Sequence, residues 1–215
     1  MKVVITGASN GIGKACADKF LANNHTVHGI DIAISSIFND NYTHHQVDVR
    51  DREYLPVISD VDILINNAGI QFGDCIGTNL KGLINTTEVY GLQPNIKSIC
   101  NMASVSAHNG AEFPEYTASK GGVLAYTKWT AKCIAEYGAT CNSISFGGVK
   151  THLNFAVMND DDKWAEIMSM TPLKKWAEPE ECAEWVYFMT VVNRSCSGQD
   201  IIVDNLETLN HKFVW

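Results

Sequence analysis

Positive charge is scarce in this chain, which has 16 lysine and arginine residues against 24 aspartate and glutamate residues and a formal net charge of -8 at pH 7. A surface that binds nucleic acid or an anionic membrane presents clustered basic side chains. We therefore expect neither partner, and we expect a small molecule instead.

Long apolar runs are also lacking. The opening stretch MKVVITG contains three consecutive apolar residues, and no later segment approaches the length of a membrane span. The apolar part of a secretory leader needs about 7 to 15 residues, and a spanning helix needs about 20. The sequence therefore predicts a cytoplasmic protein without a membrane segment.

Paired cysteines are missing as well. The seven cysteines are scattered, their number is odd, and no C-x-x-C pair occurs. This pattern favours buried reduced thiols over a zinc site or a disulfide framework. The acidic run 160–162 lacks the alternating spacing of a calcium loop and is expected to begin a helix. We predict no metal site.

Linkers rich in proline and glycine, internal repeats and low-complexity segments do not occur, so residues 1–215 are expected to form a single domain. Short β-branched runs alternate with longer amphipathic stretches, which predicts an α/β fold with a parallel sheet of about seven strands. The expected strands are 2–6, 26–30, 43–47, 61–66, 96–100, 140–145 and 200–204. The expected helices are 11–23, 75–91, 115–137 and 179–192. The long segment 150–177 is the candidate for a mobile excursion over a site.

A glycine-rich loop, TGASNGIGKA, follows the first expected strand. Glycines at 7, 11 and 13 would bring free backbone N–H groups and a helix N-terminus together, which stabilises a phosphate. The P-loop pattern would need glycine at position 8 and serine or threonine at position 15, where the chain has Ala8 and Ala15. The loop therefore favours a pyrophosphate, although a tight turn with close helix packing would also use such glycines.

Asp31 ends the second expected strand, eighteen residues after Gly13. A carboxylate there can accept hydrogen bonds from an adenosine ribose and would repel a 2′-phosphate. This position predicts NAD rather than NADP, with a solvated strand-end aspartate as the alternative interpretation.

Tyr116 and Lys120 are four residues apart on an expected helix and therefore share one face. Lowering a tyrosine pKa from about 10 to about 7 takes about 4 kcal/mol. A lysine roughly 5 Å away supplies about 3 kcal/mol at an effective dielectric constant near 20. An ordinary surface pair on a helix has the same spacing, so Tyr116 and Lys120 indicate a catalytic pair only in combination with the other motifs.

Taken together, these motifs resemble the short-chain dehydrogenase/reductase family. The chain has the family's glycine motif as TGASNGIG, its N-N-A-G motif at 66–69 and its Y-x-x-x-K motif as YTASK. Further matches are NSISFGGVKT, TPLKKWAEPEECA and SGQDIIVDN, and all of them occur in the family's order. The resemblance implies a doubly wound Rossmann fold with helices on both faces of the sheet.

The resemblance also implies a role for each matching residue. Tyr116 would be the acid/base, Ser104 would orient the substrate oxygen, Lys120 would lower the tyrosine pKa, and Asn79 would hold a water that links the lysine to solvent. The implied catalytic set is Asn79, Ser104, Tyr116 and Lys120. The implied cofactor-binding set is Gly7, Ser9, Asn10, Gly11, Ile12, Gly13, Asp31, Asp48, Val49, Asn67, Ala68, Gly69, Tyr116, Lys120, Val149 and Thr151.

The chain departs from the family pattern in three places. Phe146 replaces a usual proline, Asn205 and Leu206 replace two glycines, and several connections are short, so the chain resembles a shortened member. Substrate specificity is expected from residues 107–113 and from the excursion after Thr151.

The resulting prediction is an NAD-dependent oxidoreductase that interconverts a secondary alcohol and a ketone, and the family resemblance implies a homodimer or homotetramer. An NADPH-dependent biosynthetic ketone reductase, such as an oxoacyl reductase, and a non-catalytic NAD-binding sensor are the alternatives.

Overall fold

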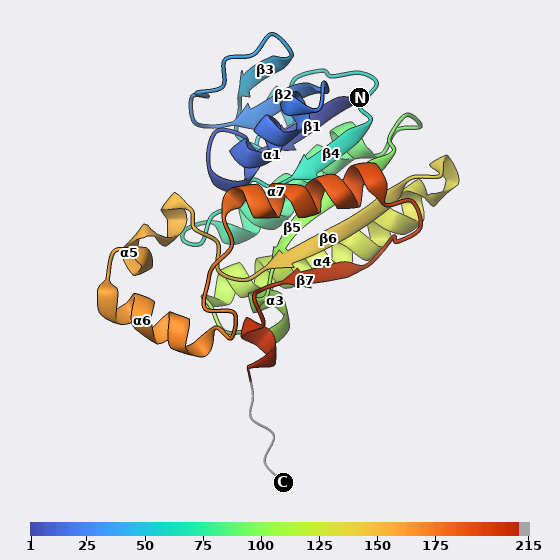
Figure 1. The fold of residues 1–215 in the computed structure, drawn as a ribbon. Helices are drawn as coiled ribbons and strands as arrows, with labels where there is room; N and C mark the ends of the chain where they lie inside the picture. The colour runs from blue at the N-terminus through green and yellow to red at the C-terminus, as the bar shows by residue number, and fades with distance from the viewer. Residues whose placement is uncertain (211–215) are drawn as a thin grey trace.

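The computed structural model describes residues 1–210, which form a seven-stranded sheet with helices on both faces (Figure 1). All neighbouring strands are parallel, in the order β3-β2-β1-β4-β5-β6-β7. The strands are β1 (Lys2–Thr6), β2 (Thr26–Asp31), β3 (Tyr42–Gln46), β4 (Ile63–Asn66), β5 (Ser98–Ser104), β6 (Thr140–Phe146) and β7 (Asp200–Val203). The strand order reverses between β1 and β4, as in a doubly wound Rossmann fold, and the predicted fold class is confirmed.

Two helical layers enclose this sheet. Helices α1 (Gly11–Ala22) and α7 (Pro179–Tyr187) pack together on one face. The other face is covered by α4 (Pro114–Ile134) and by a continuous helical stretch with π-helical turns. That stretch consists of η2 (Ile76–Gly82), α2 (Leu83–Thr86) and η3 (Thr87–Gly91). The remaining helical segments are η1 (Arg52–Tyr54), α3 (Ser106–Asn109), η4 (Ala135–Tyr137), η5 (His152–Asn154), α5 (Phe155–Met158), α6 (Asp161–Met170), η6 (Phe188–Val192) and η7 (Glu207–Leu209). No helix within residues 1–210 is long and apolar enough to cross a membrane.

The alternation of side chains along β1 builds a separate core on each face. Val3 and Ile5 pack with α1 and α7, whereas Val4 belongs to the core under α4. A parallel strand covered on both faces needs apolar residues at successive positions, which explains the continuous run VVI.

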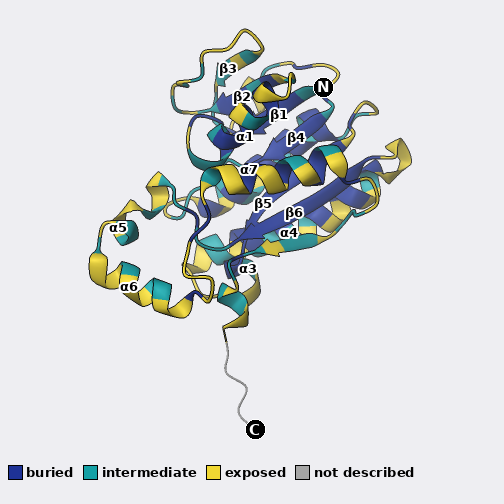
Figure 2. Ribbon diagram, in the orientation of Figure 1, coloured by how far each residue is buried: buried dark blue, intermediate teal, exposed yellow. Residues whose placement is uncertain are grey.

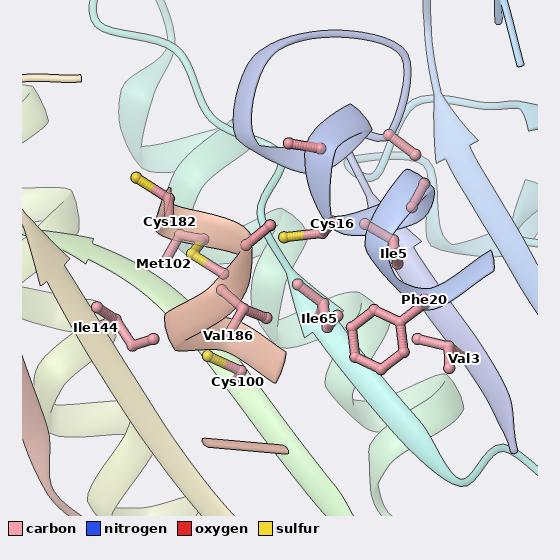
Figure 3. Packing of buried hydrophobic residues seen from close by; sticks show 14 of the residues in the cluster. Val3, Ile5, Cys16, Phe20, Ile65, Cys100, Met102, Ile144, Cys182 and Val186 are labelled. Atoms are coloured by element: carbon pink, nitrogen blue, oxygen red, sulfur yellow. The ribbon is translucent and has the colours of Figure 1, made fainter. Parts of the chain in front are cut away.

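The core between the sheet and helices α1 and α7 contains several thiols. Cys16, Cys100 and Cys182 lie there among aliphatic side chains (Figure 3). All seven cysteines are free, and five of them are buried. Burial raises the pKa of Cys100 and of Cys182 to about 12. The predicted reduced thiols are therefore packing residues.

The sheet edge at β3 has unusually little helical cover. Residues 32–41 join β2 to β3 without a helix, and η1 is the one helical segment between β3 and β4. Ile34 and Phe38 in the first connection are almost fully exposed. These short connections agree with the shortened flanks expected from the sequence.

The predicted excursion 150–177 extends from the body of the molecule and contains η5, α5 and α6 (Figures 1 and 2). Neither α5 nor α6 has a buried residue. The Asp160 carboxylate accepts a hydrogen bond from the Lys163 backbone N–H, at 3.1 Å, and thereby caps α6. The acidic run thus begins a helix, as predicted.

Candidate functional site

The carboxyl ends of the strands border a cavity of about 790 Å³. β2 reaches it with Asp31, β5 with Ser104 and β6 with Phe146. Ligands of open parallel sheets bind in this position, where the strand order reverses. The cavity contains both the glycine loop and the YTASK motif, which are more than a hundred residues apart in the sequence.

The glycine loop forms one wall of the cavity. Gly7 and Gly11 have φ values of +66° and +52°, which favour glycine. A Cβ atom on Gly13 would lie 2.0 Å from the Gly7 carbonyl oxygen, so only glycine lets α1 approach β1 this closely. Asn10 precedes α1 without a side-chain cap, which leaves the first backbone N–H groups of that helix free for an anion. This arrangement fits the pyrophosphate of a dinucleotide.

Asp31, beside the glycine loop, and Asp48 also line the cavity. The Asp31 carboxylate accepts hydrogen bonds from the backbone N–H groups of Ser9 and Ala33, both at 2.9 Å. Asp48 accepts hydrogen bonds from Arg50 through Nε, Nη2 and the backbone N–H, and these bonds lower the pKa of the Asp48 carboxyl group. Arg50 also lines the cavity, and sequence analysis did not single it out.

The middle of the cavity is built around Asn67, whose Nδ2 donates to the carbonyl oxygens of Thr6 and Gly7, both at 3.0 Å. The Thr6 hydroxyl accepts from the backbone N–H groups of Asn67 and Ala68. These bonds join the ends of β1 and β4. The other predicted cofactor residues on the cavity wall are Asn10, Ile12, Val49, Gly69, Val149 and Thr151.

Ser104, Tyr116 and Lys120 also line the cavity. The Lys120 ammonium lies 5.7 Å from the centre of the Tyr116 ring, as expected for residues four apart on α4. Its Nζ donates to the Met102 carbonyl oxygen at 2.7 Å. The structure therefore brings together three of the four predicted catalytic residues at the cavity surface.

The pKa values at this site differ from the sequence expectation. Burial raises the pKa of Tyr116 to about 12, the Glu112 carboxylate adds to the rise, and a hydrogen bond with Ser104 opposes it. Burial also lowers the pKa of Lys120 to about 8. The pKa of Tyr116 is therefore raised rather than lowered, mainly because burial removes the phenolate from water.

Asn79, Ser9 and Gly13 stand behind the cavity wall and do not line it. The Asn79 amide is buried, accepts from the Ile70 backbone N–H at 2.8 Å and donates to the Ile70 carbonyl at 2.9 Å and to Ser119 at 3.0 Å. In the structure Asn79 therefore joins the rim 67–75 to α4.

Several cavity residues were not predicted. Glu112 and Phe113 lie in the segment expected to determine specificity, but nothing in the sequence distinguished them from their neighbours. Glu207 lies beyond the last recognised motif, so nothing in the sequence pointed to it. Phe146 is buried at the end of β6, where it lines the cavity and packs in the core.

Comparison with known proteins identifies the family. A family model described as enoyl-(acyl carrier protein) reductase matches residues 7–205. The 3-oxoacyl-(acyl-carrier-protein) reductase of Vibrio harveyi is 31% identical over 216 aligned residues, which cover 86% of this chain and 88% of that protein. The chain belongs to the short-chain dehydrogenase/reductase family, a family of oxidoreductases.

Solved structures share the same fold. A 4-hydroxyisoleucine dehydrogenase in complex with NADH is 26% identical, with a TM-score of 0.87, and the match covers 98% of this chain and 99% of that one. A protein of Agrobacterium tumefaciens assigned as a 2-deoxy-D-gluconate 3-dehydrogenase, solved with bound NADP, is 25% identical, with a TM-score of 0.85 and coverage of 97% and 96%. These two relatives differ in their nucleotide.

Proposed function

We propose that this chain is an NAD(H)-dependent oxidoreductase that interconverts a secondary alcohol and a ketone by hydride transfer. The observation that carries the proposal is that Ser104, Tyr116 and Lys120 line the same cavity as the glycine loop. A dinucleotide along that cavity would extend from Asp31 to the Tyr116 side chain. The bound nicotinamide would supply or accept the hydride.

The chain's own residues would bind the dinucleotide and move the proton. Backbone N–H groups at the start of α1 would hold the pyrophosphate, and Asp48 with Val49 would contact the adenosine half. Tyr116 would exchange a proton with the substrate oxygen while Ser104 orients that oxygen. A pKa of about 12 keeps Tyr116 protonated at neutral pH, which suits proton donation during ketone reduction. Oxidation requires further stabilisation of the phenolate, to which a cationic nicotinamide would contribute.

The preference for NAD rests on Asp31. Its carboxylate lines the cavity and is held by two backbone N–H groups, so it cannot easily turn away from a ribose 2′ substituent. A 2′-phosphate there would face a fixed negative charge.

NADP-dependent reduction is the second candidate. It is favoured by the similarity to an oxoacyl reductase and to a structure with bound NADP. Arg50, a cation on the cavity wall, would be the residue that receives a phosphate, although hydrogen bonds through Nε and Nη2 already tie it to Asp48.

A non-catalytic nucleotide sensor is the third candidate. It would use the glycine loop but would have no need for a buried lysine beside a tyrosine on the cavity wall. Burying such an ammonium costs free energy, and here it is stabilised by a hydrogen bond to Met102.

The variant Tyr116→Phe separates these functions. It removes the hydroxyl and keeps the ring, so hydride exchange between a ketone and NADH should fall by at least a hundredfold while NADH binding, measured by energy transfer from tryptophan, stays within about threefold. Running both titrations with NADPH tests the nucleotide preference, for which we expect NADH to bind at least tenfold more tightly. Unchanged turnover in the variant would contradict the proposed role of Tyr116, and tighter binding of NADPH would favour the second candidate.

We further propose that the chain assembles as a homodimer or homotetramer through the helical stretch 76–91 and α4. The support on this side of the sheet is Trp129 on α4, which is about half exposed and stacks on Tyr126 with ring centres 5.2 Å apart. Exposed aromatic clusters of this kind are typical of association surfaces.

A further inference from the structure

Charged side chains divide the cavity into two ends. Among the described lining residues, Asp31, Asp48 and Arg50 belong to the proposed nucleotide end. Glu112, Glu207 and Lys120 are the charged residues of the end near Tyr116. Two carboxylates therefore share the proposed substrate end with one ammonium, and that ammonium is already bonded to the Met102 carbonyl.

Glu112 lies close to the proposed reacting groups. Its carboxylate lies near Ser104 and acts electrostatically on Tyr116 and Lys120. Glu112 is exposed as a whole, but desolvation of its carboxyl group raises its pKa, the Lys120 charge opposes the rise, and the charge of Glu207 adds to it. The two carboxylates thus repel each other across the substrate end.

Glu207 is held in position by the chain turn after β7. Asn205 and Leu206 have positive φ values of 52° and 70°, so these two positions retain the left-handed backbone that glycine would favour. The turn places the Glu207 carboxylate against the Gly148 backbone N–H, at 3.1 Å. Partial burial raises the pKa of Glu207 despite that hydrogen bond.

Aromatic side chains line the same end. Phe72 and Phe113 are in contact, with ring centres 4.3 Å apart, and both rings remain substantially exposed on the cavity wall. The Trp176 ring also lines the cavity. Carboxylates together with aromatic faces are the groups that bind organic ammonium ions.

We propose that this end of the cavity recognises an organic cation, so that the enzyme acts on amino alcohols and amino ketones, with Glu112 and Glu207 selecting the ammonium group. An ammonium placed between the two carboxylates would relieve their repulsion, whereas a carboxylate or phosphate on the substrate would increase it. This inference rests on the proposed function. In oxidation, the carbinol carbon gives its hydride to NAD⁺ and the hydroxyl proton leaves through Tyr116, so each turnover yields one amino ketone, one NADH and one proton.

The test compares isosteric secondary alcohols at pH 7 with NAD⁺. The first pair is 1-amino-2-propanol, which is protonated, and neutral 2-butanol; 3-hydroxybutyrate is the anionic probe. The second pair is (2-hydroxypropyl)trimethylammonium and neutral 4,4-dimethyl-2-pentanol. We expect kcat/KM to be at least tenfold higher for the cation in each pair and lowest for the anion.

The variants Glu112→Gln and Glu207→Gln assign the effect to these residues. Each should reduce the cation-to-neutral ratio of kcat/KM at least threefold, and this ratio is the readout because Glu112 also acts on Tyr116 and Lys120. Glu115→Gln removes the same charge three residues from Glu112 and outside the cavity lining, so it should leave the ratio unchanged.

The outcomes distinguish the two proposals. Turnover of the alcohols without a preference for the cation, or a preference that survives both glutamine variants, would overturn the inference and leave the proposed function standing. No turnover of any probe with NAD⁺ or NADP⁺ would count against the proposed function and against the inference that depends on it.

Discussion

Lys120 is a buried cation whose charge should be visible in the pH dependence of stability. Its pKa is lowered from 10.5 to about 8, mainly by burial. Between these two values the unfolded chain binds more protons than the folded chain, so the stability contributed by this group rises with pH across that window. Below pH 8, Lys120 is protonated in both the folded and the unfolded chain, and its burial destabilises the fold fully. Above pH 10.5, Lys120 is neutral in both states, and this destabilisation vanishes.

The variant Lys120→Met removes this dependence while keeping a long side chain. We expect the free energy of unfolding of the original protein, relative to the variant, to rise by up to about 1.4 kcal/mol per pH unit between pH 8 and 10.5. Urea unfolding at several pH values measures this difference, and subtracting the variant cancels the other titrating groups. If the free energies of unfolding of the two proteins changed in parallel between pH 8 and pH 10.5, Lys120 would not have the lowered pKa described above.

For individual residues, the sequence predicted which side chains come together but not their pKa values. The spacing of Tyr116 and Lys120 required only helix geometry, and both lie on the cavity wall. Their pKa values depend on burial, which comes from parts of the chain far away in the sequence. The sequence did not point to Glu112 either, because its importance comes from the groups that the fold brings near it, among them Ser104 and Glu207.

Among the elements, the contact between β1 and α1 depends most closely on one residue. An added Cβ on Gly13 would lie 2.0 Å from the Gly7 oxygen in the glycine loop and 2.4 Å from Asn67 Nδ2 after β4. Gly13→Ala should therefore lower the free energy of unfolding by about 1 to 3 kcal/mol and weaken NADH binding at least tenfold. Chemical denaturation and a fluorescence titration measure the two effects.

Gly121→Ala is the matched control for that substitution. Gly121 lies inside α4, and an added Cβ there meets no atom within 4 Å. Alanine at such a helix position should stabilise the fold by up to about 1 kcal/mol and leave NADH binding unchanged. Equal effects of the two substitutions would contradict the steric explanation for Gly13.

The order and type of the main elements followed from sequence, because strands buried on both faces read as short β-branched runs. The expected helix 115–137, for example, is the combination of α4 and η4, and the expected helix 75–91 begins with π-helical turns that periodicity does not distinguish. Within the excursion, the start of α6 at the acidic run was predicted, whereas η5 and α5 were not, because segments of three or four residues are too short to show an apolar periodicity.

For the whole molecule, the proposed association through α4 can be measured directly. Trp129→Glu places a charge on the exposed aromatic pair and should convert a dimer or tetramer into a smaller species, as judged by light scattering after size-exclusion chromatography. Trp185→Glu makes the same change on α7, on the other face of the sheet, where Trp185 is about 41% exposed, and should leave the mass unchanged. A monomeric original protein, or a mass that Trp129→Glu does not alter, would rule out this surface.

Helix α6 has ten residues and none is buried, although Trp164 touches Trp176 with ring centres 5.1 Å apart. An isolated helix of that length is only marginally formed in water. Its local opening free energy should therefore lie near zero, far below that of the sheet it is attached to. Its amide hydrogens would exchange with solvent almost as quickly as those of an unfolded chain, while the amides of β5 and β6 stay protected until the entire domain unfolds.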